Sequence, residues 1–179
     1  MLTVPEFERL ADAFDTHKED ELALKTLLLT GLRVSELLAL EKRHVGNAAL
    51  TVEQSLDTRY GAKVVSPPKS DHAYRTISIS KSLCRDINAF AATSPNEYLF
   101  QIGYTGLGKN LKKRCKALEL APLNLHALRH SHCTYLLAKG VNVIAVSKRL
   151  GHHSTGFTLD TYGHLVPSMN DKITEVLGE

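Results

Sequence analysis

Residues 126–162 hold the side chains whose types and spacing could do chemistry. His126 and Arg129 stand three positions apart, so on a helix they project from one face. A Leu-Gly-His sequence ends at His152, and Tyr162 follows ten positions later. Arginine offers a planar fork of donors that suits phosphate oxygens, and a tyrosine oxygen is a covalent nucleophile once it is activated. The set predicts attack by a tyrosine on a phosphodiester.

A second arginine, Arg33, lies in the sequence TGLRVSELLAL, with Glu36 three residues further on. Two interpretations are open. One is an exposed ion pair, worth roughly 0–1 kcal/mol. The other is an arginine held toward a buried site by its own carboxylate. The apolar residues around the pair indicate that this segment is buried, which favours the second interpretation: Leu32, Val34, Leu37, Leu38 and Leu40.

The elements that must position these residues are mostly helical. A capping box, Thr3-x-x-Glu6, predicts a helix near the amino terminus. Apolar periodicity predicts further helices at about 19–30, 82–92, 107–118, 126–139, 143–150 and 168–177. Between residues 48 and 80 the period changes toward two, which predicts strands near 49–53, 63–66 and 74–79 in a small three-stranded antiparallel sheet. The predicted fold class is therefore α+β.

Lys69 stands at the tip of the last predicted hairpin, after two prolines. It is either a solvated turn lysine or a lysine that the hairpin delivers to a bound ligand, since loops commonly carry function. Lys63 lies on the same hairpin and is the alternative. We prefer Lys69, because it falls at the turn and just ahead of the strand that contains Arg75.

Charge is unevenly distributed along the chain. The formal net charge is +3, but residues 1–21 carry −5, so the remainder carries +8. This asymmetry permits a polyanion-binding face with the amino-terminal segment turned away from it. The predicted 107–118 helix has a basic side that is either solvated or in contact with a phosphate backbone. The backbone-contact candidates are Arg75, Lys109, Lys112, Lys113 and Arg114.

Length and composition set broad limits. A chain of 179 residues suggests one domain, and 43% hydrophobic residues exclude wholesale disorder. Cys84, Cys115 and Cys133 are scattered and form no CxxC pair. No signal peptide or membrane-spanning run is visible in the sequence, so a reducing cytoplasm is the expected location.

Together these motifs resemble the catalytic domain of the tyrosine recombinase (phage integrase) family. The matching segments are TGLRVSEL, the Pro-Pro-Lys hairpin, HALRHSHCTYLLAKG, LGHH and LDTYGHL, in the family's order from about Thr3 to His164. The resemblance implies Tyr162 as the nucleophile, Glu36 as the support of the first arginine, and neither metal nor nucleotide cofactor. The other catalytic residues that it implies are Arg33, Lys69, His126, Arg129 and His152.

The resemblance also implies an activity, site-specific DNA recombination of the integrase or transposase type. One strand is cut at a time, leaving a 3′-phosphotyrosine and a free 5′-hydroxyl, and strands exchange within a homotetramer on paired sites of double-stranded DNA. It implies a bacterial or phage-encoded protein at the nucleoid. We expect residues 1–179 to be a single catalytic domain, without the family's core-binding and arm-binding domains, and a monomer in isolation. The tail helix within 165–179 either docks on a neighbouring protomer or folds back.

The chemistry agrees with elementary expectations. Two arginines hold the non-bridging oxygens of the reacting phosphate, and His152 adds a hydrogen bond to one of them. Lys69 protonates the leaving 5′-oxygen. A cationic pocket favours the phenolate of Tyr162, whose unperturbed pKa is about 10. His126 either assists proton transfer at the phenol or only orients the phosphate. We expect all six residues to converge on one basic cleft.

Three other functions compete with this one. A metallohydrolase would use His126 and His130, but Ala127 stands where zinc motifs of this spacing carry a glutamate. A non-catalytic DNA-binding module and a type IB topoisomerase-like enzyme are the others. Among the competing tyrosines, Tyr60 and Tyr74 fit the sheet, and Tyr135 fits an apolar helix.

Overall fold

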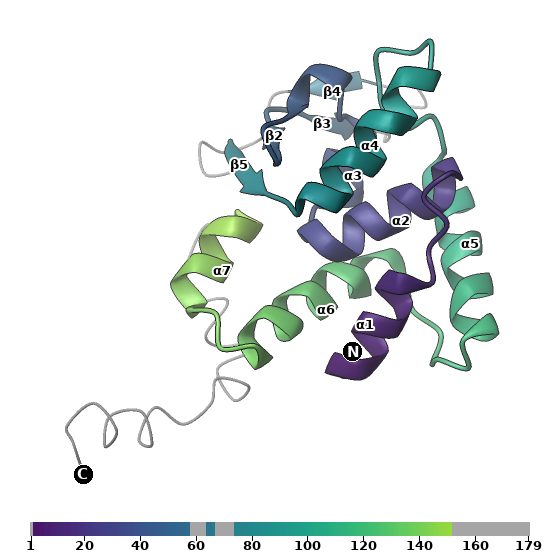
Figure 1. The fold of residues 1–179 in the computed structure, drawn as a ribbon, viewed down its shortest axis with the longest axis vertical. Helices are drawn as coiled ribbons and strands as arrows, with labels where there is room; N and C mark the ends of the chain where they lie inside the picture. The colour runs from purple at the N-terminus through teal and green to yellow at the C-terminus, as the bar shows by residue number, and fades with distance from the viewer. Residues whose placement is uncertain (1, 58–63, 67–73, 152–179) are drawn as a thin grey trace.

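The computed structural model describes residues 2–57, 64–66 and 74–151, which form a mostly helical body with two small antiparallel sheets at one side (Figure 1). This arrangement confirms the α+β class. The α-helices of this part are α1 (Val4–Asp12), α2 (Glu19–Thr30), α3 (Val34–Leu38), α4 (Lys81–Thr93), α5 (Tyr104–Ala117), α6 (Leu125–Ala138) and α7 (Val143–Leu150). A 3-10 helix, η1 (Lys42–His44), leads into the first strand.

Helix α2 lies at the centre of the fold because it is apolar on nearly all sides. Its Leu22, Leu24, Leu27 and Leu28 are at most 1% exposed, and the helix packs against α1, α3, α4, α5 and α6. It ends at Gly31, whose φ of 69° is left-handed and suits a glycine. The candidate site is built around this end of α2.

The three-stranded sheet has the order β1 (Val45–Gly46), β2 (Ala49–Val52), β5 (Arg75–Ser78). The expected number of strands is confirmed, but the expected membership is wrong. The strand predicted at 63–66 is β4 (Val64–Ser66), which pairs with β3 (Ser55–Asp57) in a separate two-stranded sheet. The third strand is instead β1, which has only two residues and is too short to give a period-two signal.

The predicted helices in the described residues are present, with small shifts at their ends. Helix α5 begins at Tyr104 rather than near residue 107, because Gly106 and Gly108 in its first turns weaken the helical signal. Asn124 caps α6 by accepting a hydrogen bond from the Ala127 N–H at 2.8 Å. The helix expected at 168–177 lies outside the described residues.

Candidate functional site

Arg33 and Glu36 form the first part of the site, at the start of α3. Arg33 is the N-cap of this helix rather than a residue within it. The Glu36 carboxylate accepts hydrogen bonds from the Arg33 main-chain N–H and from Arg33 Nη1, each at 2.8 Å. The Glu36 side chain is 4% exposed, whereas that of Arg33 is 42% exposed. The carboxylate therefore lies inside and holds an arginine that remains open to solvent.

Arg75 binds the same carboxylate from strand β5. Its Nη1 and Nη2 donate to the two Glu36 oxygens at 3.0 and 2.8 Å, and its Nε donates to the Arg149 carbonyl at 2.8 Å. The Arg75 side chain is 7% exposed. Arg75 thus lies beneath the site, and not on an exposed basic surface as its place among the DNA-backbone candidates had suggested.

The pKa of the Glu36 carboxyl reflects this environment. Burial acts to raise that pKa, but the hydrogen bonds and charge of Arg75, followed by those of Arg33, outweigh it and hold the pKa below its ordinary value. Glu36 is therefore ionised at neutral pH. One buried carboxylate balances two guanidinium groups in part, so the site keeps a net positive charge.

Arg129 is the second buried arginine of the site, and it joins the ends of two helices. Its Nη1 donates to the Gly31 carbonyl and its Nη2 donates to the Leu150 carbonyl, both at 2.7 Å. These carbonyls close the carboxyl-terminal ends of α2 and α7, where a cation is favoured. Burial, together with the charges of Arg33 and Arg75, lowers the pKa of Arg129 to about 10, so it remains a cation at neutral pH.

Gly31 allows these elements to approach closely. A Cβ at this position would lie 2.6 Å from Leu150 Cδ2 and 2.7 Å from His132 Cδ2. Its φ of 69° also disfavours any residue with a side chain. The glycine therefore lets α7 pack against the end of α2, which brings the Leu150 carbonyl within reach of Arg129.

Arg33, His126 and Arg129 line one pocket of ≈ 310 Å³. The expected convergence is confirmed for these three, and Arg33 and Arg129 do not lie on opposite faces. His126 is exposed at the start of α6, and its ring packs edge-on against that of His130, with centroids 4.4 Å apart. Burial, then the charges of His126 and Arg129, lowers the pKa of His130. The pocket thus combines two cations and an exposed imidazole.

Four residues expected in or near the site lie outside the described residues: Lys63, Lys69, His152 and Tyr162. Their catalytic assignments remain predictions. The positions of two of them in the chain can be given relative to described elements. Lys69 falls between β4 and β5, the strand that carries Arg75, and His152 follows Leu150 by two positions in the chain.

A pair formed by the buried His132 and the half-buried Arg149 supports the site from behind. His132 Nε2 accepts from Arg149 Nε at 3.0 Å, and the other ring nitrogen lies 2.9 Å from the Leu28 carbonyl. Arg149 also donates to the carbonyls of Ser78 and Leu29. Burial and the charge of Arg149 lower the pKa of His132 to about 3, so the ring is neutral. Sequence analysis missed both residues, because no spacing pattern connects α6, α7 and the end of α2.

Tyr104 was also missed, although it lines the same pocket. It is the first residue of α5 and is 58% exposed. A tyrosine after Gly103 at a helix start carries no motif that would single it out. Tyr135, by contrast, has a structural environment: its ring stacks on Phe7 at 4.0 Å, and its hydroxyl donates to Glu8.

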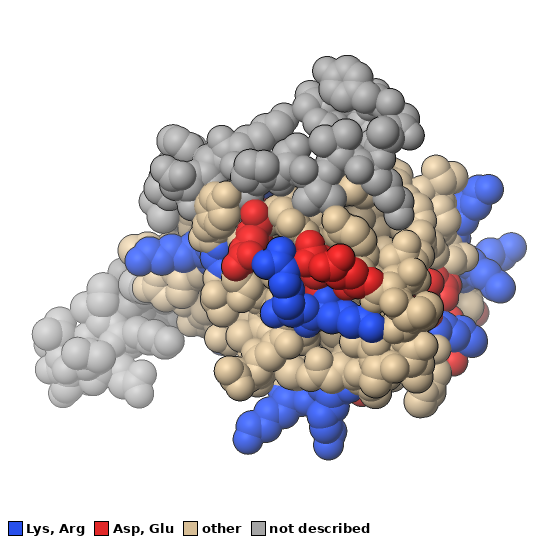
Figure 2. Space-filling view, turned by 90° about the horizontal axis from the view of Figure 1, so that it is seen from above, with Lys and Arg blue, Asp and Glu red and all other residues tan. Residues whose placement is uncertain are grey.

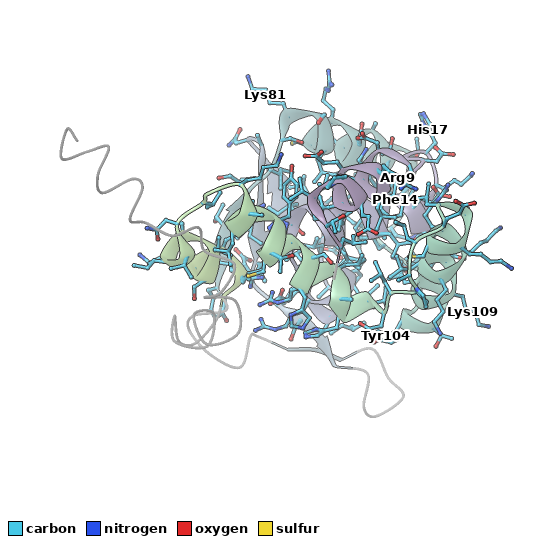
Figure 3. The ribbon with its side chains drawn as sticks, turned by 90° about the horizontal axis from the view of Figure 1, so that it is seen from below. Arg9, Phe14, His17, Lys81, Tyr104 and Lys109 are labelled. Carbon is cyan, nitrogen blue, oxygen red and sulfur yellow. The ribbon has the colours of Figure 1, made fainter. Side chains whose placement is uncertain are left out.

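The basic residues of α5 divide into two groups. Leu107, Leu111 and Cys115 form the buried side of this helix, so Lys109, Lys112 and Lys113 are exposed. Arg114 instead forms an ion pair with Glu21 of α2. In Figure 3 Tyr104 and Lys109 lie on the side of the molecule opposite to Lys81 and His17. Figure 2 shows a face on which acidic and basic side chains lie next to each other, so that face is not uniformly basic.

Two features are absent from the described residues. They contain no cluster of three or more histidine, cysteine, aspartate or glutamate side chains that could hold a metal ion. None of the helices in this part of the chain is both long enough and apolar enough to cross a lipid bilayer.

Sequence comparisons connect this geometry with known proteins. Residues 1–169 match the model of the phage integrase family. The ICEBs1 integrase of Bacillus subtilis is 33% identical over 186 residues, covering 89% of this chain and 50% of that protein. Transposase A from transposon Tn554 of Staphylococcus aureus is 31% identical over 182 residues, covering 89% of this chain and 47% of that protein. The chain spans about half the length of these relatives.

Structural comparisons agree on the fold. The Tn1549 transposon integrase, solved in complex with a circular intermediate DNA, has a TM-score of 0.81 and 20% identity, covering 99% of this chain and 65% of that one. The catalytic domain of bacteriophage HP1 integrase has a TM-score of 0.68 and 23% identity, covering 99% of this chain and 94% of that one. At these identities the likeness establishes the fold alone.

Proposed function

Because this chain belongs to the phage integrase family, we propose that it cuts and rejoins DNA at specific sites through a 3′-phosphotyrosine intermediate. The observation that carries the proposal is the pocket in which Arg33, Arg129 and His126 meet. Two guanidinium groups and an imidazole suit a phosphodiester, which gathers negative charge on its non-bridging oxygens during in-line displacement.

The arginines are held ready for this task before substrate arrives. Glu36 holds Arg33 at 2.8 Å, and two main-chain carbonyls hold Arg129 at 2.7 Å. Each guanidinium has five N–H donors, so these contacts leave others for phosphate oxygens. Fixed donors cost no reorganisation during the reaction, which is the condition for strong electrostatic catalysis.

The remaining steps fall to residues outside the described part. The Tyr162 oxygen attacks phosphorus, the bond to the 5′-oxygen breaks, and Lys69 gives that oxygen a proton. His152 donates a hydrogen bond to a non-bridging oxygen. Attack of a 5′-hydroxyl on the phosphotyrosine then reverses these events, so the bond energy is conserved and no cofactor is needed.

A nicked suicide substrate tests the proposal. Cleavage next to the nick releases a short fragment, which prevents rejoining and traps the protein on DNA. The full chain should give a covalent adduct on a denaturing gel, and Tyr162→Phe should give none, since the ring remains but the nucleophile is lost. A DNA-binding module would form no adduct with either protein. An adduct that persists in Tyr162→Phe would show that another residue is the nucleophile.

Strand exchange sets the expected assembly. Exchanging both strands of two duplexes takes four cleavages, and each chain supplies one Tyr162, so we propose a homotetramer on paired sites in the bacterial cytoplasm. The isolated chain is a monomer under this proposal, and residues 165–179 dock on a neighbouring protomer. Deleting these residues should prevent tetramer formation on DNA, measured by native gel. A tetramer that forms unchanged would contradict the docking role. A DNA relaxation assay separates recombination from topoisomerase-like activity.

A further inference from the structure

Tyr104 stands at the rim of the pocket with a large exposed apolar surface. The described residues contain three other exposed large hydrophobic side chains, Tyr74, Val141 and Ile144, and none of these lines the pocket. The Tyr104 hydroxyl forms no hydrogen bond within the described structure. A single exposed aromatic ring is common on a protein surface, so what distinguishes Tyr104, which is 58% exposed, is its place in the lining of this pocket.

The walls of the pocket differ in character. Arg33, His126 and Arg129 form a polar wall, whereas Leu38, Leu56 and Tyr104 are apolar lining residues. A phosphate group needs only the polar wall. A phosphodiester within DNA is flanked by two deoxyriboses, however, so a phosphate bound by the arginines brings a sugar against the neighbouring wall. The carbon-rich face of a deoxyribose suits an aromatic ring better than it suits water.

We propose that Tyr104 packs its ring against the deoxyribose next to the scissile phosphate and so positions the DNA strand in the site. The inference rests on the proposed function and assigns Tyr104 a positioning role, not the nucleophilic one. Its backbone is fixed for this role, because α5 is anchored by Leu107, Leu111 and Cys115, each at most 1% exposed. The exposed lysines of the same helix, beginning at Lys109, would then contact phosphates further along the DNA strand.

The contact predicts a defined pattern of variant effects. Stacking of an aromatic ring on a base is worth on the order of tenfold in affinity when the ring is replaced by alanine, and we expect a packed sugar contact to be worth about as much. Tyr104→Ala should therefore weaken DNA binding about tenfold, whereas Tyr104→Phe should bind within about twofold of the unchanged protein, since the ring remains. At saturating DNA the adduct should form in both variants, because no reacting group has been removed.

Binding is measured by fluorescence anisotropy with the full chain carrying Tyr162→Phe, so that no cleavage occurs. The matched control is Ile144→Ala, because Ile144 is a similarly exposed apolar residue of α7, at 50%, and does not line the pocket. The DNA is compared with duplexes that lack the base at either nucleotide flanking the scissile phosphate. A sugar contact predicts that the Tyr104→Ala penalty survives base removal. A penalty that disappears with the base would overturn the sugar assignment, and equal binding by Tyr104→Ala would overturn the contact itself.

Adduct formation separates this inference from the proposed function. If Tyr162→Phe abolishes the adduct while Tyr104→Ala binds normally, the recombinase chemistry stands and the inference fails. If Tyr104→Phe instead abolishes the adduct, Tyr104 is the nucleophile and both assignments fail. If Tyr104→Ala weakens binding but no protein forms an adduct, the contact stands and the chemistry fails.

Discussion

Glu36 and Arg75 form a bidentate pair across 39 positions of sequence, with N···O distances of 3.0 and 2.8 Å. Both side chains are nearly buried, at 4% and 7% exposed. Through Glu36, strand β5 fixes the arginine at the start of α3, and through the Arg149 carbonyl it also fixes the end of α7. Arg75 therefore couples the sheet to two walls of the site without lining the pocket itself.

Replacing Arg75 by alanine should destabilise the fold and slow the chemistry together. Glu36 would keep only the partly exposed Arg33 as its charged partner, and breaking a buried ion pair costs at most roughly 3–5 kcal/mol. Arg75→Lys keeps the charge but loses the planar fork and the bond to the Arg149 carbonyl, so we expect a smaller loss of stability and still a slower reaction. Urea unfolding and single-turnover adduct formation at saturating DNA measure the two effects.

The control for this prediction is Arg43→Ala, which removes an exposed arginine bonded to Glu41 and should change stability far less, because solvent screens the exposed guanidinium. If Arg75→Lys reacted at the unchanged rate, the pairing with Glu36 would be dispensable for positioning Arg33.

Local patterns in the sequence accounted for much of this fold because they depend on neighbours in the chain. The capping box at Thr3, the glycine end of α2 and the His126–Arg129 spacing all act within one helical turn. The Arg33–Glu36 contact is present too, although Arg33 caps the helix instead of lying in it. Such features are readable because a single turn brings the partners together.

Contacts between distant segments could not be read in the same way. Nothing in the alternation of β5 distinguishes Arg75, which pairs with Glu36, from a surface arginine. Arg149 and His132 meet only because α6 and α7 pack together through Cys133, Leu137, Val146 and Leu150. The pairing of β4 with β3 was likewise not predictable, because the sequence of one strand does not identify the strand that it pairs with.

The exposed lysines of α5 should contribute sequence-independent affinity for DNA. If Lys109, Lys112 and Lys113 each contact a phosphate, their combined replacement by alanine should lower the slope of log affinity against log salt by about one per contact. Anisotropy titrations over a range of salt concentrations measure the slope. Lys81→Ala is the matched control, because Lys81 lies on the opposite side of the molecule (Figure 3). An unchanged slope in the triple variant would mean that the DNA backbone does not contact these lysines.

The buried Arg129 and the half-buried Arg149 both bond to main-chain carbonyls, but their substitution should have different consequences. Arg129→Lys cannot reach both the Gly31 and Leu150 carbonyls with one ammonium and also loses its fork toward phosphate. We expect its cleavage rate to fall on the order of 10²–10³-fold, the cost of one lost transition-state donor. Arg149→Lys disturbs similar carbonyl contacts but does not line the pocket.

The Arg149→Lys variant should therefore lose stability and keep a rate within about tenfold at temperatures where it is folded, since no transition-state donor has been removed. Circular dichroism establishes the folded range, and quench-flow measures the rate. Equal losses of rate in the two variants would mean that packing, not phosphate binding, accounts for the effect of Arg129.

His132 should make the fold sensitive to mild acid. Its pKa is about 3 in the folded chain and 6.5 as the ordinary value. Between these values the unfolded chain binds a proton that the folded chain does not, so stability is full above about pH 6.5 and falls on acidification. The slope is about 1.4 kcal/mol per pH unit for this one proton. Urea unfolding at pH 7.5 and 5.0 measures the loss of unfolding free energy. His132→Gln has no group that titrates in this range, so its unfolding free energy should fall less between the two pH values.

Lys69→Ala should slow cleavage of ordinary DNA severely, because the leaving 5′-oxygen then departs without a proton. A bridging 5′-phosphorothiolate offers a thiolate that needs no proton, so this substrate should restore the rate of Lys69→Ala to near that of the unchanged chain. Lys63→Ala is the matched control, because Lys63 precedes β4 in the chain as Lys69 follows it, and this variant should cleave both substrates normally. Rates come from single-turnover adduct formation at saturating DNA. If the sulfur substrate rescued Lys63→Ala and not Lys69→Ala, the general acid would be Lys63, and if it rescued neither, the proton would come from another group.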